Sequence, residues 1–180
     1  MKIDAIIGVD PGANGGLAVW RPNHRTEVIK MPKDLTALRD YIEHMKEICT
    51  PLVFVEKLSI RPDDVVADGS GVNMSKLYRI QTMMQNFEQL KSVFEISDIP
   101  YIMVYPMKWQ SALKLRIPKE EKAQRKNRFK EVAGRLYPEV KQTLWSADAT
   151  LIMHFGRWVL VNDKKWVKEN TPAKMKDRLF

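Results

Sequence analysis

Cysteine is almost absent from this chain, because Cys49 is the only one among its 180 residues. A single thiol excludes an internal disulfide framework and is typical of a protein in a reducing compartment. Apolar runs long enough to span a membrane are also missing, since the longest runs are the size of a strand. The start, MKIDAIIGVD, has no small-residue cleavage site, so we expect no signal peptide. These absences predict a cytoplasmic protein without a membrane partner.

Acidic residues are in the minority. The chain has 22 Asp and Glu against 30 Lys and Arg, and its formal net charge is +8. Such a balance favours an anionic partner, with nucleic acid before an acidic membrane surface. The one cysteine and the three histidines form no recognisable catalytic motif, so the sequence does not indicate a classical nucleophile.

The hydrophobic pattern predicts a single α/β domain in which a mixed sheet carries helices on its faces. We expect a meander of three short antiparallel strands, then helices that alternate with two further strands. The strand at 51–56 has no apolar–polar alternation, which suits a central strand covered on both faces. The expected strands lie at 3–10, 15–21, 26–31, 51–56 and 100–105, and the expected helices at 34–48, 74–95, 108–113, 118–136 and 146–161.

Three acids stand at points where a fold of this kind places chemistry. Asp10 ends the first strand, Glu56 ends the strand at 51–56, and Asp148 lies in the first turn of the last apolar helix. If the two strands are neighbours, both carboxylates emerge at one sheet edge, and a helix N-terminus can bring the third. Three carboxylates repel one another unless a cation neutralises them, and hard oxygen ligands select Mg²⁺ or Mn²⁺. Two such ions can activate a water and stabilise the leaving oxygen of a phosphodiester.

Each acid also has an ordinary structural explanation. Asp10 precedes Pro11 and Gly12 and suits a turn, while Glu56 can pair with a nearby cation. Asp148 complements the dipole of its helix. The glycines that follow Asp10 either keep its surroundings small enough for a phosphate or simply form a hairpin turn. It is the combination of the three acids that indicates a metal site.

Four stretches resemble motifs of the RuvC-like Holliday junction resolvases of the ribonuclease H-like superfamily, most of all those encoded by phages or prophages. They are GVDPGANGGLAV, VFVEK, VYPMKWQSALKL and ADATLIMHFGRW, and the resemblance covers roughly residues 3 to 158. It implies a five-stranded mixed sheet of order 3-2-1-4-5 flanked by helices. It also implies a nuclease domain at 1–161, followed by a basic tail at 162–180.

The same resemblance implies an activity and a set of ligands. A homodimer would cut two strands of a four-way DNA junction symmetrically, in a bacterium or a phage-infected host cell. Mg²⁺ would be the cofactor, with Mn²⁺ as a substitute, and the ends would be 5′-phosphate and 3′-hydroxyl. Carried over position by position, the catalytic and metal-binding residues would be Asp10, Glu56 and Asp148.

The chain departs from this family at one position. The family usually has a fourth metal-site residue, an Asp or His, about one helical turn before the last acid. Here residues 143–146 read Thr-Leu-Trp-Ser and offer neither a carboxylate nor an imidazole. His154 lies roughly 240° around the helix from the last acid and should face elsewhere. Asp63, Asp64 and Asp68 follow the second acid, but nothing in the sequence holds them at the site, so the second metal site is in doubt.

DNA binding requires cations along the path of the phosphates. The stretch 114–130 contains eight Lys or Arg against two acids, and further cations follow the second acid and the start of the helix at 74–95. A solvated helix face is the alternative explanation for such a cluster. The expected DNA contacts are Lys57, Arg61, Lys76, Arg79, Lys108, Lys114, Arg116, Lys119, Lys122, Arg125 and Lys126.

We therefore predict a metal-dependent, structure-selective endonuclease that cleaves four-way and related branched DNA junctions. Two alternatives stay open, a non-catalytic branched-DNA binding protein and a flap or fork nuclease of the same fold. A sugar kinase or actin-like ATPase fits poorly, because those folds enclose a nucleotide between two domains and this chain supplies one. The chain also lacks a second glycine-rich phosphate loop.

Overall fold

The computed structural model describes residues 3–12, 14–58, 60 and 73–179, the last three of them through their backbone alone. Its five strands form one sheet of order β3-β2-β1-β4-β5, which confirms the order that the resemblance implied. β1 pairs antiparallel with β2 and parallel with β4, so the sheet is mixed. The strands are β1 (Ala5–Asp10), β2 (Gly16–Trp20), β3 (Glu27–Lys30), β4 (Pro51–Glu56) and β5 (Tyr101–Val104).

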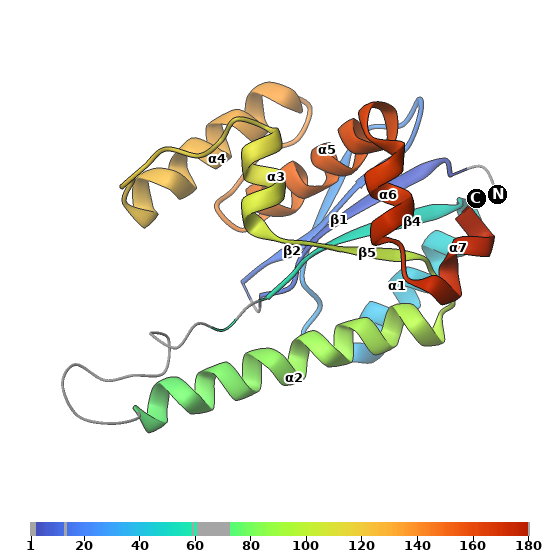
Figure 1. Ribbon diagram of the computed structural model, residues 1–180, viewed down its shortest axis with the longest axis horizontal. Coiled ribbons are helices and arrows are strands. Elements are labelled where there is room, and N and C mark those ends of the chain that lie inside the picture. The colour runs from blue at the N-terminus through green and yellow to red at the C-terminus, as the bar shows by residue number, and fades with distance from the viewer. Residues whose placement is uncertain (1–2, 13, 59, 61–72, 180) are drawn as a thin grey trace.

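Helices cover both faces of this sheet, as Figure 1 shows. One layer contains α3, α4, α5 and α6, and the other contains α1 and α2. The helices are α1 (Leu35–Ile48), α2 (Met74–Ile96), α3 (Pro106–Ala112), α4 (Lys122–Leu136), α5 (Ser146–Asn162), α6 (Lys164–Asn170) and α7 (Ala173–Leu179). Among the residues described, no helix is both long enough and apolar enough to cross a membrane.

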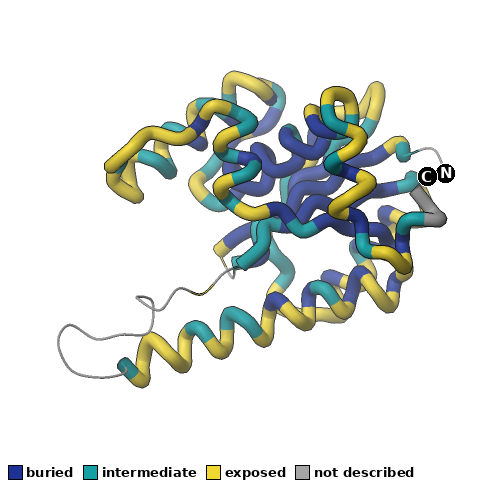
Figure 2. Tube along the Cα trace, viewed as in Figure 1, coloured by how far each residue is buried: buried dark blue, intermediate teal, exposed yellow. Residues whose placement is uncertain are grey.

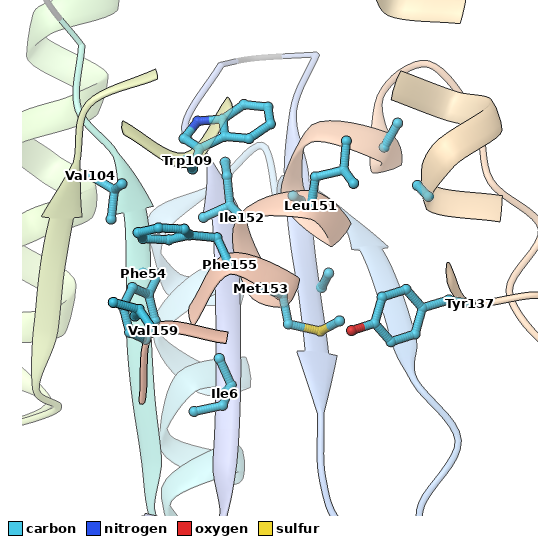
Figure 3. Packing of buried hydrophobic residues seen from close by; sticks show 14 of the residues in the cluster. Ile6, Phe54, Val104, Trp109, Tyr137, Leu151, Ile152, Met153, Phe155 and Val159 are labelled. Carbon is cyan, nitrogen blue, oxygen red and sulfur yellow. The ribbon is translucent and has the colours of Figure 1, made fainter. Parts of the chain in front are cut away.

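The central strand β4 faces a hydrophobic layer on each side. Leu52 and Phe54 belong to the core cluster under α5, and Val53 and Val55 belong to the cluster under α1 and α2. Figure 3 shows Phe155 of α5 lying over Phe54. Successive side chains of a strand point to opposite faces, so burial on both faces requires an apolar residue at every position. The unbroken apolar run in the sequence is explained by this position.

Two helix starts show how local sequence sets the elements. Asp34 caps α1 as expected, because its side chain accepts hydrogen bonds from the backbone N–H groups of Thr36 and Ala37. The basic helix begins later than expected, at Lys122 and not at Pro118. Lys119 has φ of 58°, in the left-handed region, and this conformation interrupts a right-handed helix.

The segment expected as a basic tail contains α6 and α7. Val167 of α6 is buried in the cluster under α5, and Met175 of α7 is buried in the opposite cluster. These two helices therefore contribute to both hydrophobic layers, while the division of the chain at residue 161 stays a prediction.

The two halves of α2 differ in their surroundings. Phe87, Leu90 and Phe94 of its C-terminal half are buried against the sheet. Met74 and Tyr78 of its first turns are 70% and 72% exposed. Figure 2 shows this exposed half extending beyond the body of the protein.

Candidate active site

Asp10 and Glu56 emerge side by side at one edge of the sheet. The parallel register of β1 and β4 pairs Val9 with Val55, and each acid is the residue that follows. The two strands therefore deliver both carboxylates at their carboxyl ends, as the sequence pattern predicted. In parallel sheets this edge is where loops and helix termini complete a site.

Helix α5 brings Asp148 to the same edge by lying unusually close to the sheet. A Cβ atom at Gly8 of β1 would lie 2.3 Å from the backbone oxygen of Ala149 and 2.3 Å from the backbone nitrogen of Met153. Real Cβ atoms do not approach backbone atoms so closely, so only glycine fits at Gly8. Because the helix rests directly on β1, its first turn meets the end of that strand, where Asp10 lies.

The turn after Asp10 is equally restricted. The backbone N–H of Gly12 donates a 3.4 Å hydrogen bond to Oδ1 of Asp10, and that of Gly15 donates to the carbonyl of Gly12 at 2.7 Å. A Cβ atom at Gly15 would lie 2.2 Å from the backbone oxygen of Asp10 and 2.9 Å from its Cγ. Gly15 is thus required by the turn and by its close approach to Asp10, which supports the hairpin-turn explanation, while room for a phosphate stays a prediction.

Burial and mutual repulsion raise the pKa values of two of the acids. Burial, and then the charge of Asp148, raises the pKa of Asp10 from 3.8 to about 6. Burial, and then the charge of Asp10, raises the pKa of Glu56 from 4.5 to about 7. The indole N–H of Trp109 donates a 3.0 Å hydrogen bond to Oε1 of Glu56 and partly offsets this rise. The raised pKa values show that nearby positive charge does not compensate fully for burial and repulsion, and a bound cation would add such charge.

One positive group already lies at the cluster. The ammonium of Lys126, on α4, forms an ion pair with Oδ2 of Asp148. Asp148 is only 6% exposed, and its second oxygen, Oδ1, is buried without a hydrogen-bond partner. Lys126 also lowers the pKa values of Asp10 and Glu56, so its charge acts on all three acids. Lys126 was expected among the DNA contacts, and no pattern in the sequence indicates this ion pair.

The residues at this edge fit a divalent cation by their chemistry. Asp10 and Glu56 supply hard carboxylate oxygens, and the unpartnered Oδ1 of Asp148 is a third oxygen of the same kind. In the part of the chain that the structure describes, no three His, Cys, Asp or Glu side chains converge closely enough to hold one ion together. Asp148 pairs with Lys126, which is consistent with its lying apart from an ion held by Asp10 and Glu56.

An indole fills the neighbourhood in which the family's fourth ligand was expected. Trp145 packs on the first residue of β2, since its ring carbons would lie 2.8 and 2.9 Å from a Cβ atom at Gly16. Gly16 is in turn the register partner of Asp10. The hydroxyl of Ser146 donates to Oε1 of Gln142 at 3.0 Å and accepts from the backbone N–H of Thr143 at 2.9 Å. These contacts give the segment before α5 a structural role.

His154 faces away from the acids, as its position on the helix predicted, and Trp109 lies in the core. Nδ1 of His154 is 2.9 Å from the hydroxyl of Tyr137, in a pair away from the acids. Trp109 is fully buried and packs edge-on against Phe129, with ring centroids 5.4 Å apart. Its hydrogen bond to Glu56 was not anticipated, although an indole N–H in a core needs an acceptor.

The expected DNA-binding cations fall on both sides of the acidic edge. Lys76 and Arg79 lie in the exposed first turns of α2, and the cations of the α3–α4 connection and of α4 lie in the opposite layer (Figure 1). Arg116 and Arg125 line one hollow there, together with Gln110. The exposed members on the α4 side are Lys114, Arg116, Lys119 and Lys122.

Three further candidates have different surroundings. Lys108 lies over the ring of Trp166, 5.1 Å from its centroid, and so packs toward α6. Lys57 follows Glu56 directly, and its ammonium lies 2.7 Å from the hydroxyl of Tyr105. Arg61 lies outside the described residues, as do Asp63, Asp64 and Asp68.

Tyr105 is a further candidate residue of this site, and it was not among those expected from the sequence. It is 52% exposed and follows β5, the strand next to β4. The register pairs Glu56 with Val104, which places Tyr105 opposite Lys57. The sequence offered one indication of this residue: Tyr105 is an aromatic residue directly after β5, the neighbour of the strand that ends in Glu56.

No protein-family model and no curated protein matches this chain. Among solved structures, it is similar to Thermus thermophilus RuvC in complex with a Holliday junction substrate, at 15% identity and a TM-score of 0.55. That match covers 89% of this chain and 96% of the other. A second structure of Thermus thermophilus RuvC matches at 15% identity and a TM-score of 0.52, over 87% and 95% of the two chains. The chain therefore has the RuvC-like form of the ribonuclease H-like fold.

Proposed function

We propose that this chain is a metal-dependent endonuclease that cleaves branched DNA, with the four-way junction as its main substrate. The gathering of Asp10, Glu56 and Asp148 at one sheet edge carries the proposal, because their shared negative charge calls for a cation. The fold supports it, since one structural neighbour was solved with a Holliday junction substrate. Mg²⁺ is the expected ion and Mn²⁺ its substitute.

Each acid has a distinct part in this proposal. Asp10 and Glu56 would hold the cation, with Asp148 beside them. Such an ion supplies positive charge that stabilises the leaving oxygen and favours deprotonation of the attacking water. Trp109 keeps Glu56 oriented through its indole N–H, and the absence of a side chain at Gly15 lets the turn pass close to Asp10. The products would carry 5′-phosphate and 3′-hydroxyl ends.

DNA would be held by cations from both layers. Lys57 lies directly beside Glu56, with Arg116 and Arg125 on the α4 side and Arg79 on the α2 side. Contacts with phosphates carry no base information, so selectivity would come from the shape of the branched DNA. Lys76, Lys108, Lys114, Lys119, Lys122 and Arg61 remain proposed contacts of the same kind.

A homodimer suits this activity, because symmetric cutting of a junction needs two sites. The exposed half of α2 supports self-association: it presents Met74, Leu77 and Tyr78, which are 70%, 38% and 72% exposed. Exposed apolar groups on a protruding helix are typical of an interaction surface.

Three finer features stay predictions. They are an origin in a phage or prophage, a cytoplasmic location, and the division of the chain into a nuclease domain at 1–161 and a tail at 162–180.

A non-catalytic branched-DNA binding protein is the second candidate. Trp145 supports it, because an indole cannot ligate Mg²⁺ and the family's fourth ligand is absent from residues 143–146. The ion pair between Lys126 and Asp148 also occupies one carboxylate oxygen of the cluster.

Cleavage of a labelled synthetic four-way junction with Mg²⁺ or Mn²⁺ tests the proposal, with flap, fork and plain duplex DNA as comparison substrates. We expect symmetric junction cutting that Asp10→Asn abolishes. Tight junction binding without cutting in either metal would leave the non-catalytic protein as the better description. Preferential cutting of flaps or forks would keep the chemistry and change the substrate.

A further inference from the structure

The position of Lys126 in the acidic cluster is unlike that of a phosphate contact. Its side chain is 31% exposed, and its ammonium lies on Oδ2 of an Asp148 side chain that is 9% exposed. A lysine that reaches for DNA keeps its charge in solvent, whereas this one is directed inward from α4. Exposed cations elsewhere on this helix, such as Lys130, show the alternative arrangement.

Charge neutralisation at this edge is therefore shared between a residue of the protein and an added ion. When all three carboxylates are ionised they carry three negative charges, and Lys126 supplies one positive charge inside the cluster. Oδ1 of Asp148 stays buried without a partner, which leaves one oxygen of this residue directed to no protein group. A single divalent cation would complete the neutralisation of the three acids.

Among the residues that the structure describes, those on the N-terminal side of Asp148 offer no carboxylate or imidazole to a second ion. Trp145 packs on Gly16, and the polar side chains of Gln142, Thr143 and Ser146 are hydrogen-bonded to one another. Residues 143–146 lack the anionic ligand that the RuvC-like family usually has, and Lys126 pairs with Asp148. Both features reduce the need for a second cation at this edge.

We propose that the ammonium of Lys126 takes the place of one of two cations, so that the chain binds a single divalent ion at Asp10 and Glu56. This inference rests on the proposed function, since it concerns the same acids. Lys126 is then a positioning residue that holds Asp148.

Titration of the intact, DNA-free protein with Mn²⁺, followed by electron paramagnetic resonance, tests this inference without any activity measurement. We expect one ion per chain in the unmodified protein. Lys126→Met removes a positive charge next to the ion and frees Asp148, so Mn²⁺ affinity should rise about tenfold or more. Lys126→Arg keeps the charge and should retain one ion at the original affinity.

Lys130→Met is the matched control, because it removes the same charge from an exposed position one turn further along α4. It should leave the number of bound ions and their affinity unchanged. Circular dichroism of Lys126→Met and Lys126→Arg verifies that both variants are folded before titration.

The outcomes separate this inference from the proposed function. The inference would be overturned if the unmodified chain bound two Mn²⁺ ions, or if Lys126→Met bound Mn²⁺ no more tightly than the unmodified chain. The proposed function would still hold in either case if the chain cuts junctions. A folded chain that binds no Mn²⁺ and cuts no junction would overturn both.

Discussion

The two longest helices of this protein use their apolar residues in opposite ways. α5 has 17 residues, and every residue from Ser146 to Met153 is buried. α2 has 23 residues, yet its buried residues begin only at Phe87. α5 lies directly on β1 and positions an acid, whereas the first half of α2 extends past the sheet and exposes its apolar side chains. An apolar stripe on a helix therefore does not by itself tell whether the helix builds the core or meets a partner.

The largest effect is expected where α5 meets the sheet. Gly8→Ala introduces a Cβ atom that would lie 2.3 Å from two backbone atoms of α5, and backbone cannot yield as a side chain can. We expect the free energy of unfolding to fall by about 4 kcal/mol or more, measured by urea denaturation. Gly134→Ala is the control, because the nearest atom to its Cβ is a side-chain carbon 4.0 Å away. That variant should be neutral or up to about 1 kcal/mol more stable, and a similar loss at both glycines would contradict close packing at Gly8.

The acid that α5 delivers gives the second prediction. Asp148→Asn keeps the shape of the side chain and removes its charge, so we expect junction cleavage to fall about 100-fold while junction binding persists. Single-turnover cleavage and a binding titration separate the two properties. Asp163→Asn is the control at the opposite end of α5, where Asp163 caps α6 through the N–H of Trp166. Equal cleavage by both variants would mean that Asp148 takes no part in the reaction.

The third prediction concerns the cost of burying the charge of Glu56. Its pKa is raised from 4.5 to about 7, chiefly by burial, so the folded chain holds this proton more tightly than the unfolded chain. The stabilisation from protonated Glu56 is complete below pH 4.5 and is lost as the pH rises through about 7. Glu56→Gln removes this loss and should be about 1–3 kcal/mol more stable at pH 8.

The extra stability of Glu56→Gln should disappear near pH 4. Thermal unfolding at both pH values, without divalent ions, measures this. Glu131→Gln, at an exposed position of α4, should show no such pH-dependent difference. An equal gain at both pH values would mean that the amide stabilises the chain for a reason other than charge.

The smallest effect on stability is expected in the exposed half of α2. Tyr78 is 72% exposed, so Tyr78→Ser should change the free energy of unfolding of the monomer by no more than about 0.5 kcal/mol. If two chains associate through this half, the same variant should weaken the dimer about tenfold, as sedimentation velocity would measure. Ser92→Ala, in the half that packs on the sheet, is the control for association. A dimer unaffected by Tyr78→Ser would place the interface elsewhere.

Much of the site was predictable because it depends on strand ends. Asp10 and Glu56 each follow an apolar run, and parallel neighbours bring their carboxyl ends to one edge. Asp148 was identifiable from its place at the start of an apolar helix. The start of α4 was placed four residues too early, since Pro118 suits a first turn and no local pattern announced the left-handed conformation of Lys119.

The sequence by itself determined the strands and the acids at their ends, because apolar runs are local properties of the chain, whereas the order of the strands was implied by the resemblance. Tertiary structure alone decided which groups meet across elements. Lys126 and Asp148 are 22 residues apart on two helices, and their contact depends on how α4 packs on α5. Trp109 reaches Glu56 across 53 residues for the same reason. Distances between side chains on different helices follow from packing, which no periodicity in the sequence encodes.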